Sequence, residues 1–129
     1  ELSTFGQDRI VSTTIFAPSS TADKIPLFYS PGKIFIDEII ACPEAATGLP
    51  TMEFAVRHGP SMGDDGTMIT DGVVQCVDIL GVGTIVALDQ NGQPTGSGPA
   101  GPIWFWLTDF DITFGSPRYF VITIKYHTL

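Results

Sequence analysis

Basic residues are scarce in this sequence of 129 residues: Lys and Arg number 6 against 14 Asp and Glu, giving a formal net charge of −8. Nucleic acids and anionic membrane surfaces are bound largely through clusters of Lys and Arg. We therefore expect neither nucleic acid nor a membrane as a partner. The sequence also lacks any run of about 20 apolar residues of the kind that spans a bilayer as a helix.

Cysteines and histidines are few as well, with two of each. Cys42 and Cys76 lack the CxxC spacing of zinc and redox sites. We expect two buried reduced thiols, and a disulfide between neighbouring strands is the alternative. His58 and His127 are interpreted as lying outside any nucleophile motif. The sequence thus predicts a protein that is not an enzyme, with no catalytic residues, no metal site and no cofactor.

Long intervals without glycine or proline are missing. The 14 glycines and 10 prolines leave no interval longer than twelve residues, which excludes long helices. The runs between them are rich in Ile, Val, Phe, Thr and Tyr, a composition typical of strands. We predict eight strands: Arg9–Phe16, Lys24–Tyr29, Lys33–Cys42, Thr51–Arg57, Val73–Leu80, Thr84–Leu88, Ile103–Phe114 and Arg118–Tyr126.

Short strands with long irregular connections favour an all-β fold, an antiparallel two-sheet sandwich. We predict jelly-roll topology, with an immunoglobulin-like sandwich as the alternative. A single domain is expected over residues 1–129, with residues 1–8 as an N-terminal arm. His58–Gly72 and Gln93–Pro102 are predicted to be exposed loops because they are rich in glycine, proline and polar residues.

The segment Ile103–Leu107 has apolar residues on both faces of its predicted strand. Trp104 and Trp106 point one way, and the last strand similarly places Tyr119 opposite its other apolar residues. A sandwich buries only the inner face of each sheet, so something must cover the outer face. Three coverings compete: the chain's own loops Pro43–Pro50 or Gln93–Pro102, other subunits, and a sugar stacked on the tryptophans. We expect Trp104, Trp106 and Tyr119 to bind a partner or a glycan.

Acidic residues occur in two short clusters that raise the question of a calcium site. Asp109 and Asp111 are two residues apart and therefore share one face of a strand, which we interpret as the solvent face. Asp64 and Asp65 lie between glycines in a predicted loop and do not match the ligand spacing of an EF-hand. We interpret both clusters as solvated carboxylates.

Two stretches, KIPLFYSPGKIFIDEIIAC over residues 24–42 and RYFVITIKYHTL over residues 118–129, resemble small β-sandwich proteins of tailed-bacteriophage particles. These are the capsid decoration or cement proteins. The resemblance implies a structural role in a virion, a homo-oligomer that is most simply a trimer, and a major capsid protein or other virion protein as partner. It implies a place on the capsid surface after assembly in the host cytoplasm. The alternative function is a carbohydrate-binding module or receptor-binding tip that uses the tryptophans.

Overall fold

The computed structural model describes residues 8–16, 24–44, 50–63, 65–77, 83–94 and 103–129. No helix among these residues is long and apolar enough to cross a membrane. The described elements are the strands β1 (Asp8–Phe16), β2 (Ile25–Ser30), β3 (Ile34–Glu44), β4 (Thr51–Gly59), β5 (Thr67–Met68), β6 (Val74–Val77), β7 (Thr84–Ile85), β8 (Ile103–Phe114) and β9 (Tyr119–Thr128), and the 3₁₀ helix η2 (Gln90–Gly92).

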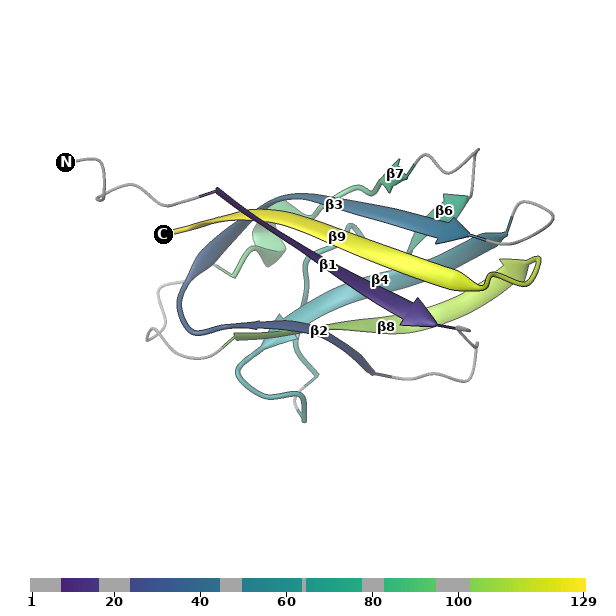
Figure 1. Ribbon diagram of the computed structural model, residues 1–129. Coiled ribbons are helices and arrows are strands. Elements are labelled where there is room, and N and C mark those ends of the chain that lie inside the picture. The colour runs from purple at the N-terminus through teal and green to yellow at the C-terminus, as the bar shows by residue number, and fades with distance from the viewer. Residues whose placement is uncertain (1–7, 17–23, 45–49, 64, 78–82, 95–102) are drawn as a thin grey trace.

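The strands form two antiparallel sheets that pack face to face (Figure 1). One sheet has the order β1-β9-β3-β7, and the other has the order β2-β8-β4-β5 with β6 also paired to β4. From β1 to β4 and from β7 to β9, consecutive strands belong to opposite sheets. This order is the jelly-roll topology, so the predicted all-β sandwich is confirmed and the immunoglobulin-like alternative is wrong.

The core lies between the two sheets and follows the two-residue period of the strands. Thr51–Arg57 alternates as the sequence predicts, with Met52, Phe54 and Val56 all buried. They face buried residues of β9 across the sandwich, and the rings of Phe54 and Phe120 are 5.3 Å apart. The largest fully buried side chains include Trp106, Phe54, Phe105, Phe120, Ile34, Ile36, Ile39, Met52, Ile69, Leu107, Ile122 and Ile124.

The segment His58–Gly72 differs most from its prediction as an exposed loop. β4 continues through Gly59, and β5 pairs with β4 again a few residues later. Ile69 and Thr70 are buried. Hydrogen bonds to Val56 satisfy their polar atoms there: Ile69 N–H donates to Val56 O at 2.9 Å, and Thr70 Oγ1 accepts from Val56 N–H at 3.2 Å. The exposed-loop prediction is therefore wrong at residues 58–59 and 69–70, whereas Pro60, Asp71 and Gly72 are exposed as predicted.

One predicted strand is shorter in the structure, because β7 contains only Thr84–Ile85 of the predicted Thr84–Leu88. β6 contains Val74–Val77 of the predicted Val73–Leu80, and residues 78–80 lie outside the described residues. Residues 1–7 of the predicted arm and 95–102 of the predicted loop lie outside the described residues.

Candidate functional site

Trp106 lies on the outer face of the sheet β2-β8-β4-β5 and is nevertheless fully buried. Its cover is formed by the end of β4 and the segment after it, where Gly59 and Gly66 lie against the indole. A Cβ on Gly66 would be 2.7 Å from Trp106 Cη2 and 2.9 Å from His58 O, and the φ of Gly66 is +75°. Only glycine combines that backbone conformation with so close an approach.

Arg57 holds this cover in place, because its Nη1 donates to Asp65 O and Gly66 O at 3.4 Å each. Among the described residues, the chain itself covers the outer face at Trp106 through Gly59 and Gly66, while residues 45–49 and 95–102 of the two loops predicted for this role lie outside the described residues. The expectation of an exposed Trp106 ring is wrong, because the two glycines allow the backbone to lie against the indole.

Beside Trp106 is a pocket of about 400 Å³, called here the Trp106 pocket. Lys24 borders it, with Nζ donating to Met62 O at 2.8 Å and lying 5.4 Å from the centre of the indole. Two cationic and two anionic side chains share the lining and balance one another in charge. The lining residues are Lys24, Arg57, Asp65, Trp106, Thr108 and Asp109.

Asp109 reaches the Trp106 pocket through a bulge in β8. The pairing of β8 with β4 shifts register between Ala55↔Thr108 and Glu53↔Asp111, and Asp109 has a φ of 54°. Strict alternation after the buried Leu107 would point Asp109 into the core. The bulge instead places Phe110 in the core and Asp109 in solvent, beside Thr108. Asp111 is also exposed, in agreement with the predicted solvent face.

The three residues predicted to bind a partner do not form one site. Trp104 is half-buried on the same face as Trp106 and packs beside Tyr29, with ring centres 4.8 Å apart and Tyr29 46% exposed. Tyr119 lies on the opposite sheet, where its ring packs edge-on against Phe16 at 5.5 Å. The structure thus brings Trp104 and Trp106 together and separates both from Tyr119.

A second surface with exposed apolar residues is the outer face of the sheet β1-β9-β3-β7. Phe16, Ile10 and Ile85 are 71%, 68% and 65% exposed. Phe16 is in register with Tyr119, and Ile85 is in register with Ile40. We call this surface the β1 face; its apolar residues are Ile10, Phe16, Ile40, Ile85, Tyr119 and Val121.

Residues 59–63, Gly-Pro-Ser-Met-Gly, have the GxSxG spacing of a serine nucleophile elbow, a motif that the sequence-based prediction overlooks. Such an elbow joins a strand to a helix, whereas this segment joins β4 to β5. Ser61 Oγ accepts a hydrogen bond from Gly63 N at 3.1 Å, and the nearby His58 is bonded to Gly92 instead. The spacing therefore lacks the structural context of the motif.

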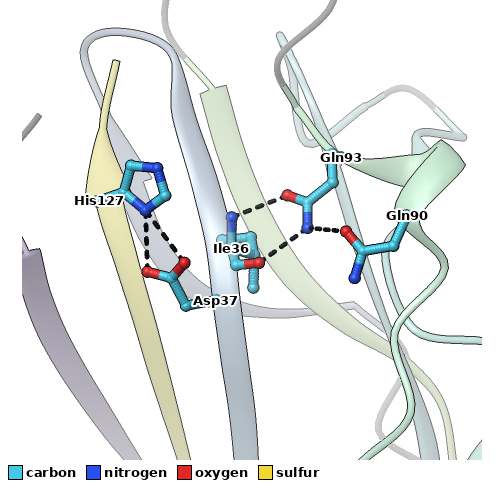
Figure 2. Close-up of polar contacts among 5 residues, drawn as sticks. All are labelled: Ile36, Asp37, Gln90, Gln93 and His127. Atoms are coloured by element: carbon cyan, nitrogen blue, oxygen red, sulfur yellow. Dashed lines mark hydrogen bonds and ion pairs between the residues drawn. The ribbon is translucent and has the colours of Figure 1, made fainter. Parts of the chain in front are cut away.

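A cluster of possible metal ligands, which the sequence did not predict, lies at one end of the β1 face. Asp8, Asp37 and His127 come from three neighbouring strands, and one ligand atom from each lies within 4.8 Å of the others. His127 Nδ1 lies 3.0 Å from Asp37 Oδ2 (Figure 2). Carboxylate and imidazole groups are ligands that zinc accepts. All three residues are partly or fully exposed, so the contact between His127 and Asp37 is a solvated surface contact of small energetic value.

Asp37 is positioned by a bulge in β3 that Gln93 supports from the other side. The register between β3 and β9 shifts between Ile36 and Glu38. β7 is too short to reach this part of β3, and the Gln93 side chain takes its place: Nε2 donates to Ile36 O and Oε1 accepts from Ile36 N, both at 2.8 Å (Figure 2). The backbone groups of Ile36 are thereby satisfied without a neighbouring strand.

His58 is buried beneath η2, with its Nε2 donating to Gly92 O. Nε2 must carry the proton, because a carbonyl oxygen can only accept. Burial lowers the pKa of His58 below its ordinary value, and the bond to Gly92 O partly opposes this effect. The histidine is therefore a neutral structural residue in the native protein near neutral pH.

We expect the free energy of unfolding to fall as the pH is lowered below about 6.5, because unfolded His58 then binds a proton that the native state binds less readily. Above that pH, the contribution of His58 is fully present. Urea unfolding at pH about 7.5 and about 5.5 measures the effect. His58→Gln keeps a donor for Gly92 O but does not titrate, so it should reduce the pH dependence. An unchanged dependence in the variant would contradict this assignment.

Neither cysteine forms a disulfide in the structure, which agrees with the predicted thiols. Cys76 is buried as predicted, whereas Cys42 is half-buried. Burial, and after it the neighbouring Cys42, raise the pKa of the Cys76 thiol to about 12. Because the thiolate is the reactive form, Cys76 behaves as a small apolar core residue.

Comparisons with family models, with curated proteins and with solved structures find no match for this chain.

Proposed function

We propose that the protein is a non-enzymatic structural component that associates with copies of itself through the β1 face and braces the shell of a virus particle. The observation that carries the proposal is the exposure of Phe16, Ile10 and Ile85 on one sheet face. Large apolar side chains gathered on a surface favour association, because burial releases the water that covers them.

The distribution of charge favours a second copy of the chain as the occupant of this face. Two chains that each carry a formal charge of −8 repel one another, so their contact needs a surface of low net charge. On the β1 face four charged residues form two ion pairs within the chain: Lys125 Nζ lies 3.2 Å from Glu38 Oε1, and Arg118 Nη2 lies 3.2 Å from Glu44 Oε2. Asp8 and Asp37 add two carboxylates at one end of the face, beside His127, so the contact is expected to centre on the apolar residues away from that end.

The edge of the sheet adds a second means of association. β1 ends the order β1-β9-β3-β7, so within the described chain it pairs with a strand on one side only. It is nine residues long, and long edge strands readily pair with other chains. A contact of standard size needs roughly 800 Å² from each partner, which is about a ninth of the total surface of 6955 Å².

The virion setting of the proposal depends on analogy. Jelly-roll sandwiches are common in viral capsid domains, and the sequence resembles capsid decoration proteins over residues 24–42 and 118–129. Under this proposal the apolar face joins copies to one another, and other surfaces contact the major capsid protein.

We expect the purified protein to be an oligomer, with a mass that is a multiple of 13.8 kDa by light scattering after size-exclusion chromatography. Phe16→Asp should shift it to the monomer, because a carboxylate in the contact would be desolvated without a partner. Phe16 is 71% exposed, so the substitution should change the free energy of unfolding of the isolated chain by less than about 0.5 kcal/mol.

Phe114→Asp is the matched control, because Phe114 is 64% exposed and lies on the opposite sheet. It should leave the oligomer intact. A monomeric wild-type protein, or equal dissociation by the two variants, would be evidence against the β1 face as the contact.

A further inference from the structure

The indole of Trp106 contains an unsatisfied donor. Its side chain is fully buried, and its Nε1 is the buried side-chain polar atom of the described residues that has no hydrogen-bond partner. Leaving a buried donor unpaired is unfavourable, and native proteins rarely do so without a functional reason. Trp106 also lines the Trp106 pocket, so the residue with the unpaired donor forms part of the wall of this pocket.

The backbone at the pocket is strained at one point. Asp109 is the residue other than glycine with positive φ in the described chain, and the bulge at this position turns its carboxylate from the core toward the pocket. Bulges and left-handed residues of this kind are frequent at binding sites, where they redirect a side chain.

The charges of the lining indicate what kind of molecule fits. An anionic ligand would be repelled by Asp65 and Asp109, and a cationic ligand would be repelled by Lys24 and Arg57. A neutral molecule with several hydroxyl groups avoids both penalties, since each hydroxyl can donate to a carboxylate and accept from a cation. A sugar ring has this set of groups and fits within about 400 Å³.

An aromatic surface continues from the pocket along the same face. Trp104 precedes Trp106 by two residues on β8, so the two side chains are about 7 Å apart along the strand. Trp104 packs beside the exposed Tyr29. Their rings offer an apolar surface on which the C–H face of a second sugar ring can stack.

We propose that the Trp106 pocket binds a neutral oligosaccharide of at least two sugar rings. Asp65, Asp109 and Arg57 hydrogen-bond the hydroxyls of the first ring, while Tyr29 and Trp104 contact the second. This binding is independent of self-association, because the pocket and the β1 face lie on opposite sheets.

The test is a titration of the full chain with neutral disaccharides: maltose, cellobiose, lactose and diacetylchitobiose. Trp104 and Trp106 are the two tryptophans of the chain, so fluorescence reports directly on this surface. We expect at least one disaccharide to bind, and Asp109→Asn to weaken it about tenfold or more through loss of a charged acceptor. Asparagine tolerates positive φ, so this variant should retain the bulge.

Asp111→Asn is the matched control, because Asp111 is also exposed on β8 but does not line the pocket. It should leave the affinity unchanged, and Phe16→Asp should retain full binding even if it dissociates the oligomer. The proposal is overturned if none of the four disaccharides binds, or if both asparagine variants bind equally well. It is also overturned if glucuronate or glucosamine binds more tightly than methyl glucoside.

Discussion

Replacement of Trp106 by alanine is expected to lower the free energy of unfolding by about 3–5 kcal/mol, the range for removing a large buried aromatic side chain. The loss combines apolar surface returned to water with a cavity beneath Gly59 and Gly66, which cannot collapse freely while Arg57 holds Asp65 and Gly66. For a chain of this length the midpoint of thermal unfolding should fall by roughly 11–18 °C.

Trp104→Ala is the control for this prediction, since it removes the same side chain from the same face of β8 at a half-buried position. We expect a loss of about 1–2 kcal/mol, because the side chain is already partly in water and its main described contact is Tyr29. Urea unfolding of both variants gives the comparison. Equal losses would show that Gly59 and Gly66 do not cover Trp106 in solution.

The contrast between the two tryptophans shows what the strand pattern determines. Alternation in Ile103–Leu107 predicts which residues face the core and which lie on the outer face, and the structure confirms it for Phe105 and Leu107. The cover over Trp106 depends on Gly59 and Gly66, which come from a distant segment of the sequence. Composition predicts that something must cover the outer face, but it does not identify the segment.

Bulges limit the prediction in a different way. In Lys33–Cys42 strict alternation groups Ile40 with Ile34 and Ile36, whereas the bulge at Asp37 puts Ile39 in the core and Ile40 on the outer face. The bulge at Asp109 redirects a carboxylate in the same manner. Neither position is a glycine, so the sequence contains no local signal for the change of face.

The strand order of the jelly roll determines which candidate residues meet. Tyr119 follows the tryptophan strand after a short turn, yet β8 and β9 belong to opposite sheets and their outer faces point apart. Conversely, Lys24, Arg57 and Asp109 are far apart in sequence and line one pocket, because β2 and β4 flank β8. Periodicity alone does not encode that order, so the pocket could not be assembled from sequence.

Gly92→Ala is expected to lower the free energy of unfolding by about 3 kcal/mol or more, at or above the usual upper limit for overpacking. Gly92 is buried where η2 crosses the segment after β5, and a Cβ would collide with Met68 O and lie 3.3 Å from Ile69 Cα. These are backbone atoms that cannot rotate away, so η2 would have to move and would stretch the bond between His58 and Gly92 O.

Gly32→Ala, whose Cβ has no neighbour within 4 Å, should change stability by less than about 0.5 kcal/mol. Guanidinium unfolding of the two variants measures the difference, and a Gly92→Ala protein as stable as Gly32→Ala would mean that η2 does not pack against residues 68–69.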